Sequence, residues 1–172
     1  MTLLVIDIQK GITDERLYNF EEFISNTKNI IEAARNKGVE IIYVQHDDGL
    51  GTGFSIGDEE FEIATEVAPI GGEKIFYKTV NSSFGNKELA AYLEEKEESQ
   101  LIIVGLQTNF CIDATIKSAF DRGYEVIIPA GCNSTFDNEY MSAEATYQYY
   151  NQMMWPERFG KCVTVKEAID LM

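Results

Sequence analysis

The 172-residue sequence contains only one histidine and three cysteines. Stable zinc sites use three or four protein ligands, with more His or Cys than this chain offers, so no metal centre is expected. Three cysteines, an odd number lying far apart in the sequence, do not form a disulfide framework either. We therefore expect free thiols and a protein that works without a metal or another cofactor.

Basic residues are also scarce, since 14 Lys and Arg stand against 29 Asp and Glu, which gives a formal net charge of −15. Binding to DNA, RNA or an anionic membrane surface needs clustered Lys and Arg, and no such cluster is visible. No apolar run approaches the length of a membrane span, and the amino terminus lacks the features of a signal peptide. We expect a cytoplasmic protein whose partner is a small-molecule substrate.

Linkers rich in Pro, Gly or Ser are absent as well, so residues 1–172 are expected to form one domain. Apolar, β-rich segments alternate with helical patterns, as in parallel α/β proteins. The pattern predicts a three-layer α/β fold, a parallel six-stranded sheet with helices on both faces. The predicted strands cover residues 2–6, 39–45, 73–77, 101–104, 124–129 and 163–165, and the helices 23–38, 86–97, 111–122, 139–154 and a short terminal segment.

Three potentially reactive side chains, Asp7, Lys78 and Cys111, each follow a separate predicted strand. The carboxyl ends of parallel strands lie on one edge of a sheet, where open α/β sheets bind ligands, so these side chains are expected to meet. Cys111 also falls in the first turn of a predicted helix, where the helix N-terminus and a nearby ammonium would both lower the thiol pKa.

This trio suits nucleophilic catalysis. We interpret Cys111 as the nucleophile, Asp7 as the group that accepts its proton and returns it to the leaving nitrogen, and Lys78 as the cation that holds Asp7. Backbone N–H groups in the turn from Gln107 to Cys111 are the candidate oxyanion hole. A simpler interpretation treats a cysteine on a helix face as a small hydrophobic residue, and we apply it to Cys132 and Cys162.

The pocket wall is harder to predict from the sequence. Residues 49–68 lack any periodicity and are expected to form a loop that binds ligand or acts as a lid. His46 and Asp47 precede this loop, but one histidine beside carboxylates makes a poor metal site, so His46 is interpreted as a hydrogen-bonding residue at its base. The candidates for substrate contact are Gln9, His46, Phe54, Phe84 and Trp155.

The predicted helix after Cys111 has a second apolar row, formed by Ile112, Ile116 and Phe120. This row is expected to pack on a neighbouring helix of the same chain or, together with the aromatic segment 147–155, on another subunit. We favour a homo-oligomer, of two or more subunits.

Several motifs, spread over nearly the whole chain, resemble the isochorismatase-like cysteine hydrolase superfamily. The resemblance implies a Rossmann-like sheet of strand order 3-2-1-4-5-6 and a catalytic triad of Asp7, Lys78 and Cys111. It also implies a non-proline cis peptide between Leu106 and Gln107 that places the N–H groups of Gln107 and Cys111 in the oxyanion hole. The matching motifs are Leu-Val-Ile-Asp-Ile-Gln at 4–9, Tyr-Val-Gln-His-Asp at 43–47, Lys78, Asn-Ser-Ser-Phe at 81–84, Gly-Leu-Gln-Thr-Asn-Phe-Cys-Ile-Asp-Ala-Thr at 105–115 and Arg-Gly-Tyr-Glu-Val at 122–126.

The resemblance also narrows the expected reaction. Nicotinamidases of this superfamily hold a metal with an aspartate and two histidines, and a chain with one histidine does not match them. Because Cys111 is present, we expect a metal-independent cysteine hydrolase that cleaves a C–N bond of a small amide or ureide through an acyl-cysteine. The alternatives are isochorismatase-type vinyl ether hydrolysis, in which the cysteine is a bystander, and a thiol sensor or small-molecule binding module on the same fold.

Overall fold

Parallel strands form the centre of the computed structural model, which describes residues 1–172. The strands are β1 (Thr2–Ile6), β2 (Glu40–His46), β3 (Lys74–Lys78), β4 (Gln100–Leu106), β5 (Glu125–Pro129), β6 (Asn133–Ser134) and β7 (Lys161–Val163). The helices are α1 (Phe20–Lys37), α2 (Lys87–Glu95), α3 (Asp113–Asp121), α4 (Ala143–Tyr149) and α5 (Val165–Leu171). No helix combines the length and the apolar character needed to cross a membrane.

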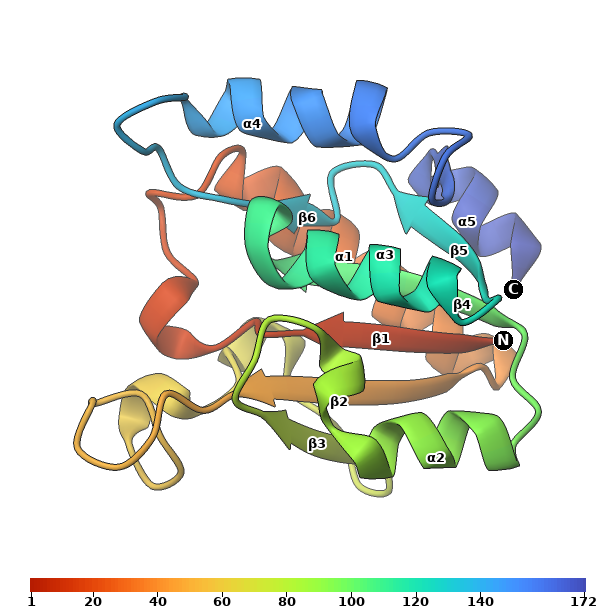
Figure 1. The fold of residues 1–172 in the computed structure, drawn as a ribbon, viewed down its shortest axis with the longest axis horizontal. Coiled ribbons are helices and arrows are strands. Elements are labelled where there is room, and N and C mark those ends of the chain that lie inside the picture. The colour runs from red at the N-terminus through yellow and green to blue at the C-terminus, as the bar shows by residue number, and fades with distance from the viewer.

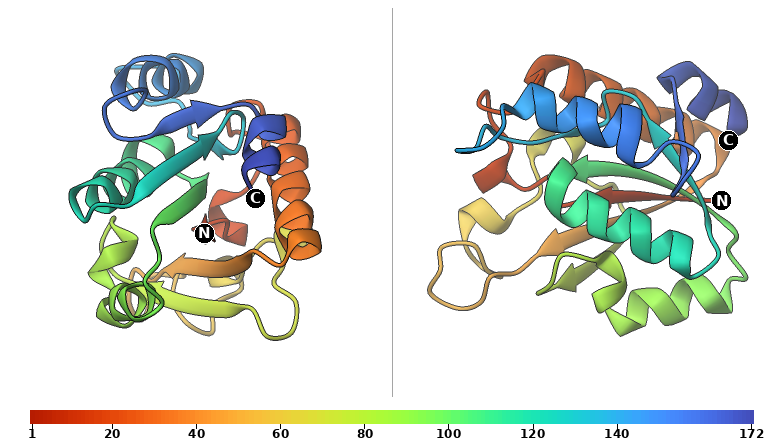
Figure 2. Two further views of the ribbon diagram at one scale, coloured as in Figure 1. Left: turned by 90° about the vertical axis from the view of Figure 1, so that its right-hand side faces the viewer. Right: turned by 45° about the horizontal axis from the view of Figure 1, so that its top comes forward.

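The strand order is β3-β2-β1-β4-β5-β7, with every pairing parallel, and the short β6 pairs with β4. This confirms the expected order 3-2-1-4-5-6, except that β7 takes the sixth place because β6 precedes it in the chain. The helices α1 and α5 cover one face of the sheet, and α2 and α3 cover the other (Figures 1 and 2). The fold is therefore the predicted three-layer α/β arrangement.

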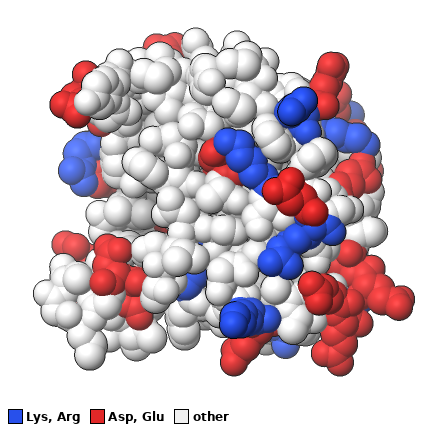
Figure 3. All heavy atoms as spheres, in the orientation of Figure 1, with Lys and Arg blue, Asp and Glu red and all other residues white.

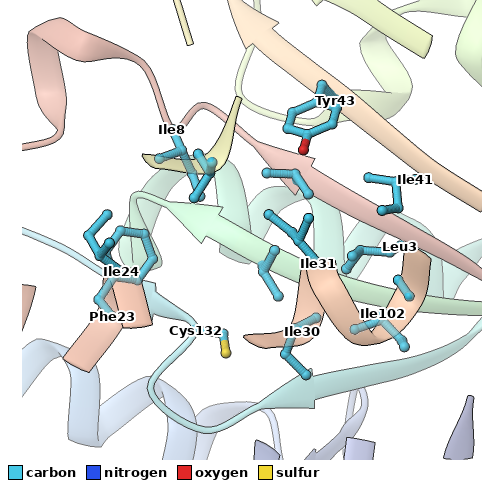
Figure 4. Packing of buried hydrophobic residues seen from close by; sticks show 14 of the residues in the cluster. Leu3, Ile8, Phe23, Ile24, Ile30, Ile31, Ile41, Tyr43, Ile102 and Cys132 are labelled. Atoms are coloured by element: carbon cyan, nitrogen blue, oxygen red, sulfur yellow. The ribbon is translucent and has the colours of Figure 1, made fainter. Parts of the chain in front are cut away.

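Both faces of β1 are buried, which explains its continuous apolar sequence. Its side chains alternate between two cores: Leu3 and Val5 pack beneath α1, whereas Leu4 and Ile6 pack beneath α2 and α3. Figure 4 shows the first of these cores, where side chains of α1 meet those of β1 and β4. Cys132 is completely buried in this core, in agreement with its interpretation as a small hydrophobic residue.

Gly105 faces the backbone of β1 in a conformation that leaves no room for a side chain. Its φ is +131°, and a Cβ atom added there would lie 1.9 Å from the backbone oxygen of Ile6, so only glycine fits. Ile6 and Gly105 are paired in the sheet register. The parallel pairing of β1 with β4 places their carboxyl ends side by side, and two of the predicted reactive residues follow these ends.

Several predicted boundaries shift by a few residues. The helix expected from residue 139 begins at Ala143. The Asn138 side chain accepts the N–H groups of Tyr140 and Met141 in the preceding turn, and Ser142 caps the helix by accepting from Ala145 N. The last strand ends at Val163, since Thr164 caps α5 in a capping box with Glu167.

The second apolar row after Cys111 is used mainly within the chain. Ile112 and Ile116 are completely buried in the core beneath α2 and α3, together with Trp155. Phe120 remains about half exposed, at 48%, and its ring packs edge-on against Phe159. Much of the apolar surface that favoured a homo-oligomer is thus already covered, and the oligomeric state stays a prediction.

Candidate active site

The three predicted reactive side chains converge at the carboxyl edge of the sheet. Asp7 directly follows β1, Lys78 is the last residue of β3, and Cys111 lies in a single π-helical turn, Thr108–Ile112, between β4 and α3. The Lys78 ammonium donates to Asp7 Oδ2 at 2.7 Å and to Cys111 Sγ at 3.2 Å. All three side chains are buried, so the contacts are made away from bulk water.

Lys78 has a third partner, Nδ1 of His46, at 2.9 Å. An ammonium has three donors and no acceptor, so Asp7, Cys111 and His46 use all of its hydrogens. His46 Nδ1 must then be the acceptor, so Nε2 is the ring nitrogen that can donate. Nε2 faces Asp48 Oδ1 at 3.1 Å and is placed to donate to it.

Gln9 holds the backbone on both sides of this histidine rather than contacting the cleft. Its amide accepts from His46 N at 2.8 Å and donates to His46 O at 3.0 Å and to Phe61 O at 2.9 Å. The side chain is completely buried and does not line the cleft. The prediction of Gln9 as a substrate contact was therefore wrong, because its hydrogen-bonding capacity is spent on joining the loop 49–68 to the sheet.

A metal ion would have to compete with Lys78. Ligand atoms of Asp7, His46 and Cys111 lie within 4.8 Å of one another, close enough in principle to surround an ion. The Lys78 ammonium already contacts the same three side chains. Since a second cation would face direct repulsion from this ammonium, the cluster fits lysine and not a metal.

The protonation state of Cys111 differs from the prediction. Burial and the nearby Asp7 carboxylate together raise the pKa of Cys111 to about 12, and they outweigh the opposing effect of Lys78. Burial likewise raises the pKa of Asp7, although Lys78 acts to lower it. The Cys111 side chain is thus a neutral thiol, because desolvation disfavours the thiolate more than one shared ammonium can stabilise it.

Asp7 retains an unused oxygen. Oδ2 accepts from Lys78, whereas Oδ1 is buried and has no hydrogen-bond partner in the chain. Asp7 also has a φ of 52°, in the left-handed region that non-glycine residues seldom adopt. A free carboxylate oxygen beside a thiol can accept its proton, which is the role predicted for Asp7.

A cleft of about 190 Å³ opens above these residues, and we call it the catalytic cleft. It is lined by Asp7, Ile12, His46, Asp48, Phe54, Asn81, Gln107, Phe110 and Cys111. Among the predicted substrate contacts, His46 and Phe54 do line it. Four lining residues were not predicted: Ile12, Asp48, Asn81 and Phe110. Two of them could have been, because Asn81 lies in the turn after β3 and Phe110 lies next to Cys111, at the same edge of the sheet.

Two aromatic predictions are corrected. Phe84 is buried against Tyr124, with ring centroids 5.6 Å apart, and does not reach the cleft. Trp155 is completely buried, and its indole Nε1 donates to Asp113 Oδ1 at 2.9 Å on the α3 side of the sheet. Both side chains belong to the core because the stacked Tyr124 ring and the Asp113 carboxylate hold them there.

The predicted cis peptide between Leu106 and Gln107 is present. Gln107 lies at the start of the turn that carries Cys111 and lines the cleft. None of the hydrogen bonds in this turn uses the Gln107 N–H as donor, so that group is free to bind an oxyanion. The oxyanion hole formed by Gln107 and Cys111 remains a prediction, with geometry that is compatible with it.

The short strand β6 braces this turn. Thr108 Oγ1 donates to Asn133 Oδ1 at 2.8 Å, and Thr135 Oγ1 donates to Asn109 Oδ1 at 2.6 Å. Asn133 in turn exchanges hydrogen bonds with Asn151, just beyond α4. The sequence did not indicate this buried network, since polar residues in a loop give no signal of their partner.

The fold and the site together define an α/β protein with a buried Asp–Lys–Cys cluster at the carboxyl edge of its sheet. The model of the isochorismatase domain family matches residues 1–167. The isochorismatase family protein YddQ from Bacillus subtilis is 31% identical over 86% of this chain and 86% of its own length. A streptothricin hydrolase from Streptomyces noursei is 25% identical over 78% of this chain and 50% of its own length.

A crystal structure of an isochorismatase family protein superimposes with a TM-score of 0.87 at 28% identity, covering 95% of this chain and 97% of that one. The protein belongs to the isochorismatase family of hydrolases. The predicted family resemblance is thereby confirmed.

Proposed function

We propose that this protein is a metal-independent amidohydrolase that cleaves a C–N bond of a small amide or ureide through an acyl-cysteine intermediate. The observation that carries the proposal is the buried Lys78 ammonium, which contacts both Asp7 and Cys111 while Asp7 Oδ1 stays free. The assignment of catalytic roles to this triad is part of the proposal. Two relatives, a nicotinamidase from Arabidopsis thaliana and a ureidoacrylate amidohydrolase from Yersinia enterocolitica, are named for cleaving amide-type bonds.

Because the Cys111 thiol is neutral, it carries a proton that can pass to Asp7 and then to the leaving nitrogen. As the Cys111 Sγ–C bond forms, Asp7 takes the thiol proton, and the negative charge on the carbonyl oxygen is bound by the N–H groups of Gln107 and Cys111. When the C–N bond breaks, Asp7 passes that proton to the leaving nitrogen. Water then attacks the thioester and gives a proton to Asp7; the C–S bond breaks and the proton returns to Cys111.

Lys78 keeps its proton throughout. It holds Asp7 Oδ2, so that Oδ1 is the oxygen presented to the cleft, and it stabilises sulfur as charge develops there. His46 accepts the third hydrogen of Lys78 and thereby fixes the direction of the ammonium. His46 is a positioning residue in this scheme.

The alternatives have less support. Vinyl ether hydrolysis of an isochorismate-like substrate requires binding of two carboxylates, yet no Lys or Arg lines the catalytic cleft. A peroxide-sensing thiol has to be readily ionised, whereas the pKa of Cys111 is raised to about 12. The small cleft and the acidic chain favour a small-molecule substrate over a nucleic acid or a membrane surface.

The test is a panel of small amides and ureides assayed with the wild type, Cys111→Ala and the matched control Cys162→Ala. Cys162 is partly buried and does not line the cleft, so its loss should leave hydrolysis unchanged. Cys111→Ala should lower the rate by at least about a thousandfold. Mass spectrometry of acid-quenched wild type should show the acyl adduct on the peptide that contains Cys111. Equal hydrolysis by wild type and Cys111→Ala would refute covalent catalysis.

A further inference from the structure

A second cavity adjoins the catalytic cleft on the far side of Phe110. It has a volume of about 510 Å³ and shares Gln107 and Phe110 with the cleft, and we call it the outer chamber. Its remaining walls come from residues 135–140, the segment between β6 and α4, together with Asn109. Gln107, whose N–H is a proposed oxyanion donor, therefore lies on the border between the two spaces.

The catalytic cleft by itself is small. Its volume is about 190 Å³. Ligand sites for larger molecules usually occupy about 300–1,000 Å³, a range that the cleft reaches only together with the outer chamber. The unpaired Asp7 Oδ1, in a side chain only 2% exposed, marks the cleft as the place where the reacting bond binds.

The outer chamber combines aromatic rings with negative charge. Phe110, Phe136 and Tyr140 provide rings, Asp137 and Glu139 provide carboxylates, and no Lys or Arg lines either space. In Figure 3, most Lys and Arg side chains lie in the right-hand half of the view, away from the end toward which β1 and β2 point. Rings and carboxylates together are the usual environment for an organic cation.

One cationic side chain of the protein already lies against a ring of this chamber. The Arg16 guanidinium lies 5.1 Å from the centre of the Phe136 ring, but Asp14 pairs with it through two hydrogen bonds. Arg16 therefore adds little net positive charge. Asp137 accepts a hydrogen bond from Ala143 N with Oδ1, whereas Glu139 is exposed and forms no hydrogen bond or ion pair within the chain.

We propose that the outer chamber binds an ammonium or guanidinium group on the leaving amine of the substrate. This inference rests on the proposed amidohydrolase function. The acyl group becomes bound to Cys111, which lines the catalytic cleft and not the outer chamber, so the acyl group belongs in the cleft. The amine on the other side of the scissile bond then extends past Gln107 and Phe110 into the chamber and leaves through it.

The first experiment compares acetamides that differ only in the charge at the far end of the amine: those of 1,4-diaminobutane, pentylamine and 5-aminopentanoate. We expect kcat/KM to be about tenfold higher for the cationic than for the neutral amide, and lower again for the anionic one. Glu139→Gln should lower the ratio of cationic to neutral kcat/KM, because Glu139 is the carboxylate of the chamber that has no partner within the chain. The control Glu95→Gln removes the same charge from the exposed end of α2 and should keep the wild-type ratio, which separates a local effect from the net charge of −15.

The second experiment measures binding without turnover. Benzyltrimethylammonium added to the ¹⁵N-labelled wild type should shift the amide resonances of residues 136–140, and benzyl alcohol and benzoate should not. If none of the acetamides is hydrolysed but the cation still shifts these resonances, the proposed function fails and the cation site stands. If the acetamides are hydrolysed without regard to charge and the cation shifts nothing there, the cation site is refuted and the hydrolase function stands.

Discussion

Replacing Asp7 by asparagine should change two properties of Cys111 in opposite directions. Hydrolysis should stop, because the group that exchanges protons with the thiol and the leaving nitrogen is lost. Alkylation of the thiol should become faster, because the Asp7 carboxylate contributes, after burial, to the raised pKa of Cys111. Asparagine has nearly the same shape, and its Oδ1 can still accept from Lys78.

The size of the second effect follows from the geometry. A carboxylate oxygen of Asp7 and Cys111 Sγ lie within 4.8 Å of each other. Two unit charges at that separation, with an effective dielectric constant of about 20, repel by about 3.5 kcal/mol, which corresponds to roughly a 300-fold change in thiolate fraction. Since the remaining solvent exposure screens part of this repulsion, we expect iodoacetamide to react about 30- to 300-fold faster in Asp7→Asn at neutral pH.

Intact-protein mass spectrometry can follow this reaction between pH 7 and 9, with peptide mapping to separate Cys111 from the other two thiols. The wild type should label slowly, and its rate should rise about tenfold per pH unit over this range, because it stays well below the pKa of about 12. Equal or slower labelling of Asp7→Asn would refute the electrostatic account of the site. Amide hydrolysis by this variant within tenfold of wild type would refute the role of Asp7 in proton transfer.

Four further substitutions test the fold and the ion pairs. Lys78→Met should lower kcat/KM by at least about a thousandfold and unfolding free energy by about 3–5 kcal/mol, because it leaves a buried carboxylate without its partner. Gly105→Ala should cost more than about 4 kcal/mol through its clash with the backbone of β1, whereas Gly123→Ala, with a φ of +89° and open space around it, should cost about 1–2 kcal/mol. Glu73→Gln should cost about 1–2 kcal/mol at pH 7, since Arg35 binds this carboxylate at 2.8 and 3.0 Å. Burial opposes ionisation of Glu73, but these hydrogen bonds prevail and lower its pKa, so the cost should shrink as the pH falls below the ordinary range for glutamate and through this lowered pKa.

Each of these predictions can be contradicted by a specific measurement. Urea denaturation curves that coincide for the two glycine variants would contradict the clash of a side chain at residue 105 with the backbone of β1. A Glu73→Gln cost that is the same at pH 3 and pH 7 would show that the carboxylate charge does not stabilise the folded state. For Lys78→Met, steady-state kinetics within tenfold of wild type would exclude this side chain from catalysis.

The sequence by itself determined the fold class and the reactive trio. Continuous apolar segments at β1 and β4 are typical of strands buried on both faces, and polar residues directly after them could only fall on the carboxyl edge of a parallel sheet. The convergence of Asp7, Lys78 and Cys111 was therefore predictable from three separate stretches of sequence. The family motifs added the strand order and the cis peptide, which no local pattern contains.

Only the tertiary structure decided how these groups are protonated and what surrounds them. A lysine and a helix start suggested a lowered thiol pKa, but desolvation depends on what covers the sulfur, and burial raises the pKa of Cys111 to about 12. Gln9, Phe84 and Trp155 were assigned to the pocket by chemical type, yet their partners lie in distant segments and hold them in the core. The outer chamber likewise exists only because the segment after β6 returns beside Phe110. Sequence patterns report which face of an element is apolar, whereas burial and charge proximity are properties of several elements brought together.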